Sequence, residues 1–578
     1  MNELINHLAI APILLPLATA ALMVALGERR RNIKATIAVI STLVTIIFAV
    51  TLLNFANSQP PGSAESISVY LLANWPAPFG IVLVVDRLSA LMLTLAGVVT
   101  FAGLLFSIAR WHRVGLHFHA LLQFLLAGLN GAFLTGDLFN LFVFFEVLLA
   151  ASYGLVLHGS GTPRVKAGLH YIAVNLVAST LFLIGASLIY GAAGTLNMAD
   201  IAARVPGLGD SERMLLEAGA AILGVAFLVK AGMWPLCFWL PGAYAAAVPP
   251  VAAVFSIMTK VGVYVILRLW PMVFGVEAGA SAYFGGNWLL IGGIVTVAFG
   301  AIGLLAAQDL PRLASFNLLV SSGTLLAAIA VGSVGVTGGA LFYLVSSTLA
   351  VCAFFLLIDL IERGRIPGAD VLAVTVEALG DEEEDEKDGA DPVGIAIPAT
   401  MAILGIGFAA CALLLAGLPP LTGFIAKFLM MNALFPTDAE AASTTIGPVS
   451  WTLLAMLLLS GFAVMIAMMR AGIRVFWVPL ESTVPTVRFL EVVPIVALLL
   501  ISATLTVQAG PVSRYMHATA ESLHAPEAYV RGVLSTKRVK PQGQATGEGQ
   551  ATSPAPAKVD GNGNGTENGT APERGGQP

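Results

Sequence analysis

Long apolar stretches, each about long enough to cross a lipid bilayer, dominate the chain. A membrane-spanning helix needs about 20 mostly apolar residues, and by this measure the sequence predicts about fourteen transmembrane helices. Their expected ranges are 5–27, 34–54, 80–109, 114–134, 137–158, 166–190, 214–237, 249–273, 286–306, 312–332, 338–361, 393–434, 451–470 and 489–508. The expected fold class is therefore an all-α polytopic membrane protein.

Two of these stretches are interrupted by proline. The stretch 393–434 is too long for one straight helix and contains Pro419 and Pro420. The stretch 214–247 is interrupted near Pro235, and its end continues as a short lateral segment. Non-helical backbone at membrane depth is tolerated only where it is buried in protein or lines a watery cavity. We therefore predict that helices seven and twelve are broken, a pattern that marks ion sites in transporters.

Basic residues are concentrated in alternate loops. They are Arg29, Arg30, Arg31, Lys34, Arg110, Arg113, Arg164, Lys166, Arg312, Arg363, Arg365, Arg470 and Arg474. The positive-inside rule places these loops in the cytoplasm, so both termini are expected on the outer side. The arginines follow the first apolar stretch, whereas a cleaved signal peptide carries its positive charges before the apolar core. The first stretch is therefore expected to be a retained helix.

A weak internal repeat relates two parts of the chain. Tyr171 and Tyr343 begin similar apolar runs, and Lys230 near one break is matched by Lys427 near the other. Because five helices are an odd number, the two five-helix units are expected to have inverted topology. The expected organisation is a three-helix segment at 1–113, repeats at 114–273 and 286–470 with an acidic cytoplasmic loop at 366–392, a last transmembrane helix at 489–510, and a disordered tail at 535–578.

Composition supports a membrane protein. Hydrophobic residues make up 57% of the chain and charged residues 11%, against about 25% charged residues in a soluble protein, and the mean hydropathy is +0.87. Basic patches interleaved with aromatic residues, the signature of nucleic-acid binding, are not found. The segment 381–386 is a run of acidic residues, which is typical of a solvated loop. From 535 on, the polar composition is typical of disorder.

Four charged residues lie inside predicted membrane helices: Glu146, Lys230, Lys260 and Lys427. One charge at the bilayer centre costs about 2.5–3.5 kcal/mol on insertion scales, so these groups are expected to face protein or water. A structural ion pair between helices is one interpretation of Glu146. The other is a proton relay in which Glu146 pairs with Lys230, because a lysine can release its proton and an arginine does not. Lys260 then acts as the next carrier, and Lys427 as the last.

Other polar residues are weaker candidates. Asp137 begins a helix, where a carboxylate is favoured by the positive end of the helix dipole, so structure explains it as well as function does. His170 lies either near a membrane-embedded polar path or at the cytoplasmic end of helix six. Sequences that bind nucleotide phosphates, zinc or dinucleotides are not found, nor are paired histidines at haem-ligand spacing. We therefore expect no metal and no cofactor.

The motifs around the four charges resemble a known family. The segments 136–146 (GDLFNLFVFFE), 228–236 (LVKAGMWPL), 239–241 (WLP) and 417–424 (GLPPLTGF), with Lys427, resemble the D-type subunit of the Mrp-type (Pha or Mnh) monovalent cation/proton antiporters. That family is similar to the proton-pumping antiporter-like subunits of respiratory NADH dehydrogenase. The resemblance covers about residues 5–510. It implies that Glu146, Lys230, Lys260 and Lys427 match the relay residues of helices five, seven, eight and twelve.

The chain departs from this family in one place. Related sequences often carry a histidine where Ser346 stands, and some carry a further lysine near Val351. A serine can hold a water molecule but does not titrate near neutrality. A continuous side-chain relay through helix eleven is therefore in doubt, and water would have to bridge it.

The function predicted from these features is that of a subunit of a multi-subunit Na+/H+ antiporter in the bacterial plasma membrane. It would carry protons driven by the proton motive force, together with other subunits, and the cation would be Na+, with K+ or Li+ as alternatives. The chain would be a secondary transporter subunit and not an enzyme. A proton-pumping subunit of NADH dehydrogenase or of a membrane-bound hydrogenase is the main alternative, and a scaffold with an inactive relay is the third.

Overall fold

The structure is a computed structural model, and it describes residues 7–27, 30–59, 67–115, 117–363, 399–435, 447–476, 487–536 and 538. All the helices and strands named below belong to one compact unit, Met1–Lys537. The predicted acidic segment 381–386 and the tail beyond 538 lie outside the described residues.

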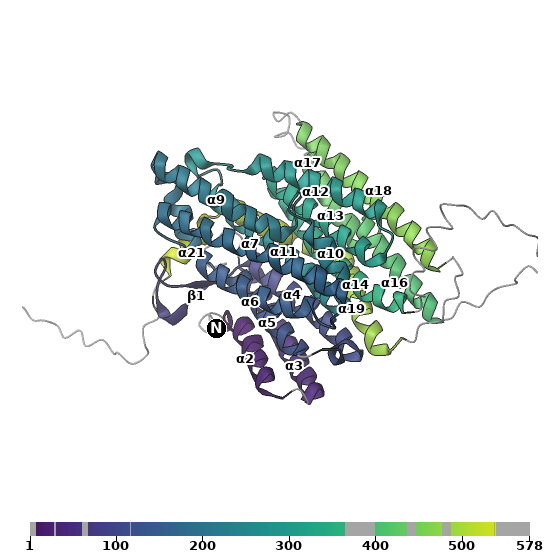
Figure 1. Cartoon of the computed structure of the whole chain (residues 1–578). Coiled ribbons are helices and arrows are strands. Elements are labelled where there is room, and N and C mark those ends of the chain that lie inside the picture. The colour runs from purple at the N-terminus through teal and green to yellow at the C-terminus, as the bar shows by residue number, and fades with distance from the viewer. Residues whose placement is uncertain are drawn as a thin grey trace, which may run out of the picture. The chain divides into compact units, whose positions relative to one another are not determined.

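Helices make up almost all of the described chain (Figure 1). Twelve of them are long and apolar enough to cross a membrane, which agrees with the predicted polytopic class. They are α3 (Arg31–Ser58), α4 (Arg87–Ala109), α6 (Leu138–Val156), α7 (Thr162–Ala193), α9 (Asp210–Ala231), α11 (Pro249–Val273), α12 (Gly286–Ala306), α13 (Leu310–Val331), α14 (Val334–Glu362), α16 (Ala399–Ala416), α18 (Pro448–Phe476) and α19 (Phe489–Val507). Three shorter apolar helices accompany them, namely α2 (Ala11–Ala25), α5 (Phe118–Leu134) and α17 (Thr422–Leu434).

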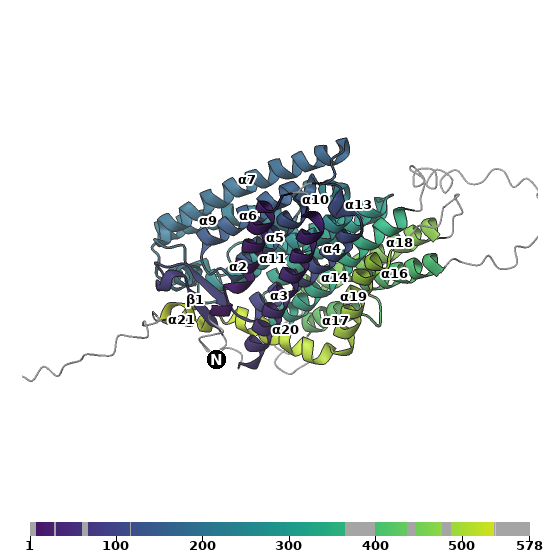
Figure 2. The ribbon, with the colours of Figure 1, turned by 90° about the horizontal axis from the view of Figure 1, so that it is seen from below.

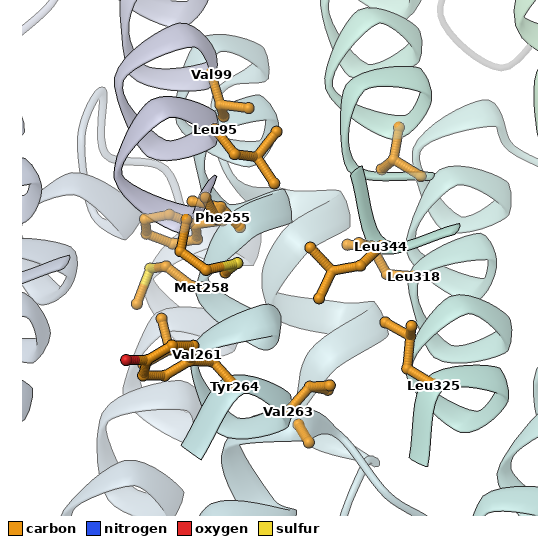
Figure 3. Close-up of a cluster of buried hydrophobic side chains, with 14 of the residues drawn as sticks. Leu95, Val99, Phe255, Met258, Val261, Val263, Tyr264, Leu318, Leu325 and Leu344 are labelled. Carbon is orange, nitrogen blue, oxygen red and sulfur yellow. The ribbon is translucent and has the colours of Figure 1, made fainter. Parts of the chain in front are cut away.

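The interior of the bundle is built around α11 and α14. The apolar windows of both helices are fully buried inside the protein, whereas only a third of the corresponding window of α7 is buried. Figure 3 shows Phe255, Met258 and Val261 of α11 packed among apolar side chains from its neighbours. Because an apolar membrane helix is hydrophobic all round, burial and not composition separates these central helices from the peripheral ones.

Both predicted helix breaks are present. α9 ends at Ala231, and Gly232 follows with φ +74°, a left-handed conformation that favours glycine at a helix C-terminus. A short helix, α10 (Trp239–Ala246), follows this break. In the second case α16 ends at Ala416, Gly417 has φ +74°, and α17 begins at Thr422.

The sequence prediction of a helix starting at residue 80 was wrong at its N-terminal end. Residues Val82–Val85 form strand β2, which pairs antiparallel with β1 (Ser68–Leu71). α4 begins only at Arg87, because Asp86 and Ser89 form a capping box in which each side chain accepts a hydrogen bond from the other's backbone N–H at 2.9 Å. A short valine-rich run next to a helix has no periodicity of its own, so the sequence pattern does not separate it from the helix.

Two amphipathic helices follow the last membrane span and were missed. They are α20 (Ala509–His524) and α21 (Glu527–Ser535). α20 packs along α14, and α21 packs on the short helix α8 (Met198–Arg204) and on β1. Figure 2 shows both helices on the side of the bundle that also carries β1. They connect elements of the two predicted repeats on one face of the protein.

Candidate functional site

Lys230 lies in the last turn of α9, immediately before the first break. Its side chain is 8% exposed, and its Nζ donates a hydrogen bond of 2.7 Å to Oδ1 of Asn175 on α7. The Asn175 amide nitrogen in turn donates to the carbonyl oxygen of Tyr171, at 2.7 Å, one turn earlier. This second bond fixes the amide so that its oxygen faces the lysine. The acceptor of Lys230 is therefore neutral.

Glu146, in the middle of α6, is half-buried and is not hydrogen-bonded to Lys230. Its Oε1 is buried and has no hydrogen-bond partner, and among the described residues no ion pair joins it to a lysine. The two groups are near enough for a Coulombic interaction, and Lys230 Nζ lies 5.8 Å from the ring of Phe145, the neighbour of Glu146. The carboxylate and the ammonium therefore lie on adjoining helices without direct contact.

Lys260 lies halfway along α11 and is fully buried. Its Nζ donates a hydrogen bond of 2.7 Å to Oγ of Ser321 on α13. Ser321 is also 2.9 Å from Oγ of Ser347 on α14. The lysine in the middle of the bundle is thus connected to two further helices through hydroxyl groups.

Lys427 lies on α17, after the second break, and is 5% exposed. Its Nζ donates to the carbonyl oxygen of Ala416, the last residue of α16, at 3.0 Å. A Cβ on Gly417 would stand 2.8 Å from Lys427 Cδ, so the glycine leaves room for the lysine chain. The C-terminal carbonyls of a helix lack partners within the helix, and the break offers one of them to the ammonium.

Each of the two breaks has a lysine beside it, although the hydrogen-bond partners of the two lysines differ. Lys230 belongs to the last turn of α9, and Lys427 reaches back to the last turn of α16. A helix C-terminus carries about half a negative charge and favours a cation nearby.

The accessory candidates divide into two groups. Pro235, Pro419 and Pro420 lie in the two breaks, and Ser346 on α14 donates a hydrogen bond of 2.9 Å to Oγ1 of Thr422, which begins α17. Their positions are close to the lysine-bearing segments. The remaining two candidates do not join the lysines. Asp137 caps α6 and accepts from the backbone N–H of Asn140 at 2.9 Å, and His170 is exposed on α7, where its ring lies 5.3 Å from that of Phe238.

Sequence reasoning missed the neutral partners of the lysines, which are Asn175, Ser321 and Ser347. Asn175 is 1% exposed and Ser321 is 1% exposed. For Asn175, the sequence does offer a signal, which is a polar amide side chain inside an apolar span. Serines occur often in membrane helices, so nothing in the sequence distinguished Ser321 and Ser347 from the serines beside them.

A buried ion pair lies on the face that carries β1 and α21. Arg268, at the end of α11, donates from Nη1 to Asp86 Oδ2 at 2.5 Å and from Nη2 to Oδ1 at 2.8 Å. Burial alone would raise the pKa of the Asp86 carboxyl, but the Arg268 charge and the hydrogen bonds it donates lower that pKa below its usual value of 3.8. Asp86 is therefore ionised at neutral pH, and the pair ties α11 to the start of α4.

Three histidines cluster near the C-terminal ends of α4 and α6 and the start of α5. The rings of His112 and His119 lie 5.5 Å apart, and Nε2 of His158 is hydrogen-bonded to the Trp111 carbonyl oxygen at 3.0 Å. Burial lowers the pKa of His112 and of His158, which keeps both neutral near pH 7. Within the described residues, histidine, cysteine and acidic side chains form no group of three or more that would hold a metal ion.

Comparison with known proteins gives consistent results. A family model described as "NADH:quinone oxidoreductase/Mrp antiporter, TM" matches residues 135–453. A Rhizobium meliloti (strain 1021) protein, named as the D-type subunit of a probable K(+)/H(+) antiporter, is 60% identical over 542 residues, which cover 94% of this chain and 100% of that protein. The D-type subunit of the Na(+)/H(+) antiporter of Alkalihalophilus pseudofirmus is 33% identical, and the match covers 92% of this chain and 99% of that protein.

A solved structure is similar over the same length. One chain in the structure of the Mrp complex from Dietzia sp. DQ12-45-1b superposes with a TM-score of 0.76 at 25% identity. The match covers 92% of this chain and 99% of that chain. The similarity therefore extends over nearly the whole of the described fold.

Proposed function

The chain belongs to the NADH:quinone oxidoreductase/Mrp antiporter family, and on this premise we propose that it is the D-type subunit of a multi-subunit monovalent cation/proton antiporter in the bacterial plasma membrane. It is a secondary transporter subunit that conducts protons, driven by the proton motive force. The observation that supports this function is the set of three buried lysines, each of which donates to a neutral acceptor. Lysines in such surroundings can lose and regain a proton, as a relay requires.

The first step of the relay is an exchange of partners at Lys230. With its proton, the ammonium can leave Asn175 for Glu146, whose Oε1 has no other partner. Beside a carboxylate the charged form of a lysine is favoured, and beside a neutral amide it is less so. Movement between the two acceptors therefore couples the position of the Lys230 side chain to its protonation state. Lys260 and Lys427 pass the proton on along the interior.

The transported cation is proposed to be K+, with Na+ second. The relative named for K(+) is 60% identical to the chain, and the relative named for Na(+) is 33% identical. Antiport measured in vesicles with either K+ or Na+ as the only alkali cation separates these two possibilities. A response to Na+ alone would refute the K+ assignment.

The finer membrane topology is also a proposal. The twelve long helices together with α2 and α5 give fourteen crossings if α16 and α17 are the two halves of one broken helix. The inverted repeats would be 114–273 and 286–470, with the three helices before 113 and the helix at 489–510 outside them. Both termini would then face outward. Labelling of a cysteine placed at either terminus by an impermeant reagent in intact cells tests this orientation.

A proton-pumping subunit of a respiratory enzyme remains the second candidate, because the family description includes NADH:quinone oxidoreductase. Purification of the chain with its natural partners distinguishes the two. Flavin or iron–sulfur proteins among the partners would support the respiratory complex, whereas small hydrophobic subunits and cation-dependent antiport would support the antiporter.

The relay is tested by removing its first two members. Glu146→Gln and Lys230→Ala are each expected to abolish antiport while the complex still assembles, because each removes a titratable group that the exchange needs. Lys166→Ala, at an exposed lysine near the start of α7, is the matched control and is expected to leave antiport unchanged. Antiport is measured by dequenching of a pH-sensitive dye in inverted vesicles, and near-normal activity in either relay variant would refute the assigned roles.

A further inference from the structure

A small pocket lies where the beginning of α4, the end of α11 and the helices α20 and α21 meet. Its volume is about 30 Å³, whereas one water molecule needs about 10–15 Å³ of such space. Its polar lining consists of Asp86, Arg87, Arg268, Thr519, Ser522 and Tyr529, and the remaining wall is apolar. The pocket is therefore large enough for a ligand bigger than one water molecule, and charged groups line it.

Arg87, the first residue of α4, has guanidinium nitrogens that lack a partner among the described residues. Arg87 is 5% exposed. Its Nη2 donates to the backbone carbonyl oxygen of Gln59 at 2.6 Å, but its Nε and Nη1 are buried and bind no group there. A guanidinium keeps its charge and has only donors, and burying a charge is costly unless it is paired and hydrogen-bonded. Because Arg87 lines the pocket, a ligand in the pocket can accept from these donors.

The neighbouring Asp86 does not supply the missing acceptor, because it is bound to Arg268. Its two carboxylate oxygens accept from Arg268 at 2.5 and 2.8 Å, and Oδ1 also accepts from the backbone N–H of Ser89 at 2.9 Å. Two arginines and one aspartate leave one positive charge around the pocket. A pocket with this charge and with unused N–H donors favours an anion over a cation.

The C-terminal helices close the pocket over these charges. The hydroxyl of Tyr515 on α20 donates to the backbone carbonyl oxygen of Arg87 at 2.7 Å. The ring of Tyr529 on α21 lies 5.2 Å from the Arg268 guanidinium. Each helix is therefore attached to one of the two arginines, and a ligand between them contacts the pocket only while both helices are docked.

We propose that this pocket binds one small inorganic anion, of the size of chloride, through the Nε–H and Nη1–H groups of Arg87. A space two to three times that of one water molecule suits a monatomic anion better than a phosphate group with its four oxygens. A ligand that binds the docked arrangement and not the open one stabilises the docked one. The anion is therefore a structural ligand that holds α20 and α21 on the bundle, and it takes no part in the proposed proton relay.

The test is hydrogen exchange of the backbone amides of α20 and α21 in the assembled complex, with chloride exchanged for gluconate. Both salts are used at one ionic strength, so that general screening is the same, and gluconate is too large for the pocket. Chloride binding makes local opening of the two helices rarer by the factor 1 + [Cl⁻]/Kd, so exchange slows about 100-fold at a chloride concentration of 100 Kd. Equal exchange rates of the wild type in the two salts would overturn the proposal.

Variants of Arg87 assign the effect to this pocket. Arg87→Met removes the charge and the donors, and it is expected to abolish the difference between chloride and gluconate. Arg213→Met is the matched control, because Arg213 also lies near the start of a helix, α9, but is paired with Asp210 at 2.9 Å and does not line the pocket. The control is expected to keep the full chloride effect.

A second variant tests the geometry of the donors. Arg87→Lys keeps the positive charge but loses the planar fork of N–H groups, so the same slowing is expected only at a higher chloride concentration. An equal chloride effect in the wild type and in Arg87→Met would place the anion elsewhere and overturn the assignment. Should Arg87→Met fail to assemble, wild-type chloride affinity in Arg87→Lys would overturn the role of the Arg87 donors.

Discussion

The most informative perturbation is replacement of Asn175 by alanine. Asn175 is the neutral acceptor that holds the Lys230 ammonium at 2.7 Å, and its own amide is anchored to the Tyr171 carbonyl. In Asn175→Ala the lysine loses this acceptor, and Glu146, with which it already interacts electrostatically, is the acceptor of the proposed exchange that remains. We expect Lys230 to stay paired with Glu146, so that the exchange between the two acceptors stops.

The size of the effect follows from the bond that is lost. A hydrogen bond to a charged group contributes about 1.5–3 kcal/mol, and about 1.4 kcal/mol corresponds to a factor of ten in an equilibrium. Removing the Asn175 bond therefore lowers the population with Lys230 away from Glu146 by roughly 10- to 150-fold. If this exchange limits transport, the antiport rate falls by a similar factor.

The assay is antiport in inverted vesicles, with the amount of assembled complex measured in the same membranes. Asn317→Ala is a suitable control, because Asn317 is also a buried helical asparagine that donates to the carbonyl one turn earlier, Leu313, at 3.1 Å, and has no lysine as a partner. Asn175→Ala is expected to be far less active than Asn317→Ala at equal assembly. Equal antiport in the two variants would refute the exchange of partners at Lys230.

Three further predictions concern the ion pair and the last lysine. Arg268→Ala leaves the Asp86 carboxylate buried without its partner, so thermal unfolding of the purified complex should report a loss of about 3–5 kcal/mol; an unchanged melting temperature would contradict this. Because the folded-state pKa of Asp86 lies below its usual 3.8, the stability it contributes is complete above about pH 4 and is lost as the pH falls further. The stability difference between wild type and Asp86→Asn should accordingly be constant from pH 8 to about pH 5, and a decrease within that window would argue against the pair. Lys427→Ala should abolish antiport, and Lys427→Arg should fail to restore it because arginine does not release its proton; full activity of Lys427→Arg would show that only the charge matters.

The membrane helices could be predicted closely from the sequence. The expected ranges 249–273 and 286–306 coincide with α11 and α12, because a long apolar run is a signal along the chain that needs no knowledge of neighbours. The two breaks were also predictable, since proline and glycine interrupt the runs. The hairpin of β1 and β2 was not, because a strand of four valine-rich residues beside a helix carries too little pattern.

The candidate site could be predicted only in its charged members. A lysine in an apolar span is expensive and therefore conspicuous, which identified Lys230, Lys260 and Lys427. Asn175 was a weaker signal in its apolar span, and Ser321, like the serines beside it, is recognised only by what it touches. The predicted pairing of Glu146 with Lys230 depends on how the helices pack, which the sequence does not show. In this structure the lysine is hydrogen-bonded to Asn175 instead.

The three lysines differ in one respect that bears on the order of events. Lys230 lies in the last turn of α9, and Lys427 on α17 donates to the carbonyl of Ala416 at the end of α16, so both lysines lie next to a break. Lys260 lies on an unbroken helix, fully buried, and its hydrogen-bond partner is a hydroxyl. Non-helical backbone at membrane depth is tolerated where it is buried in protein or lines a watery cavity, and Lys230 (8%) and Lys427 (5%) beside the breaks are slightly more exposed than Lys260 (0%). In the proposed relay, Lys260 is therefore the member whose proton has to enter and leave through protein side chains, and Ser321 is the side chain to which its ammonium is hydrogen-bonded.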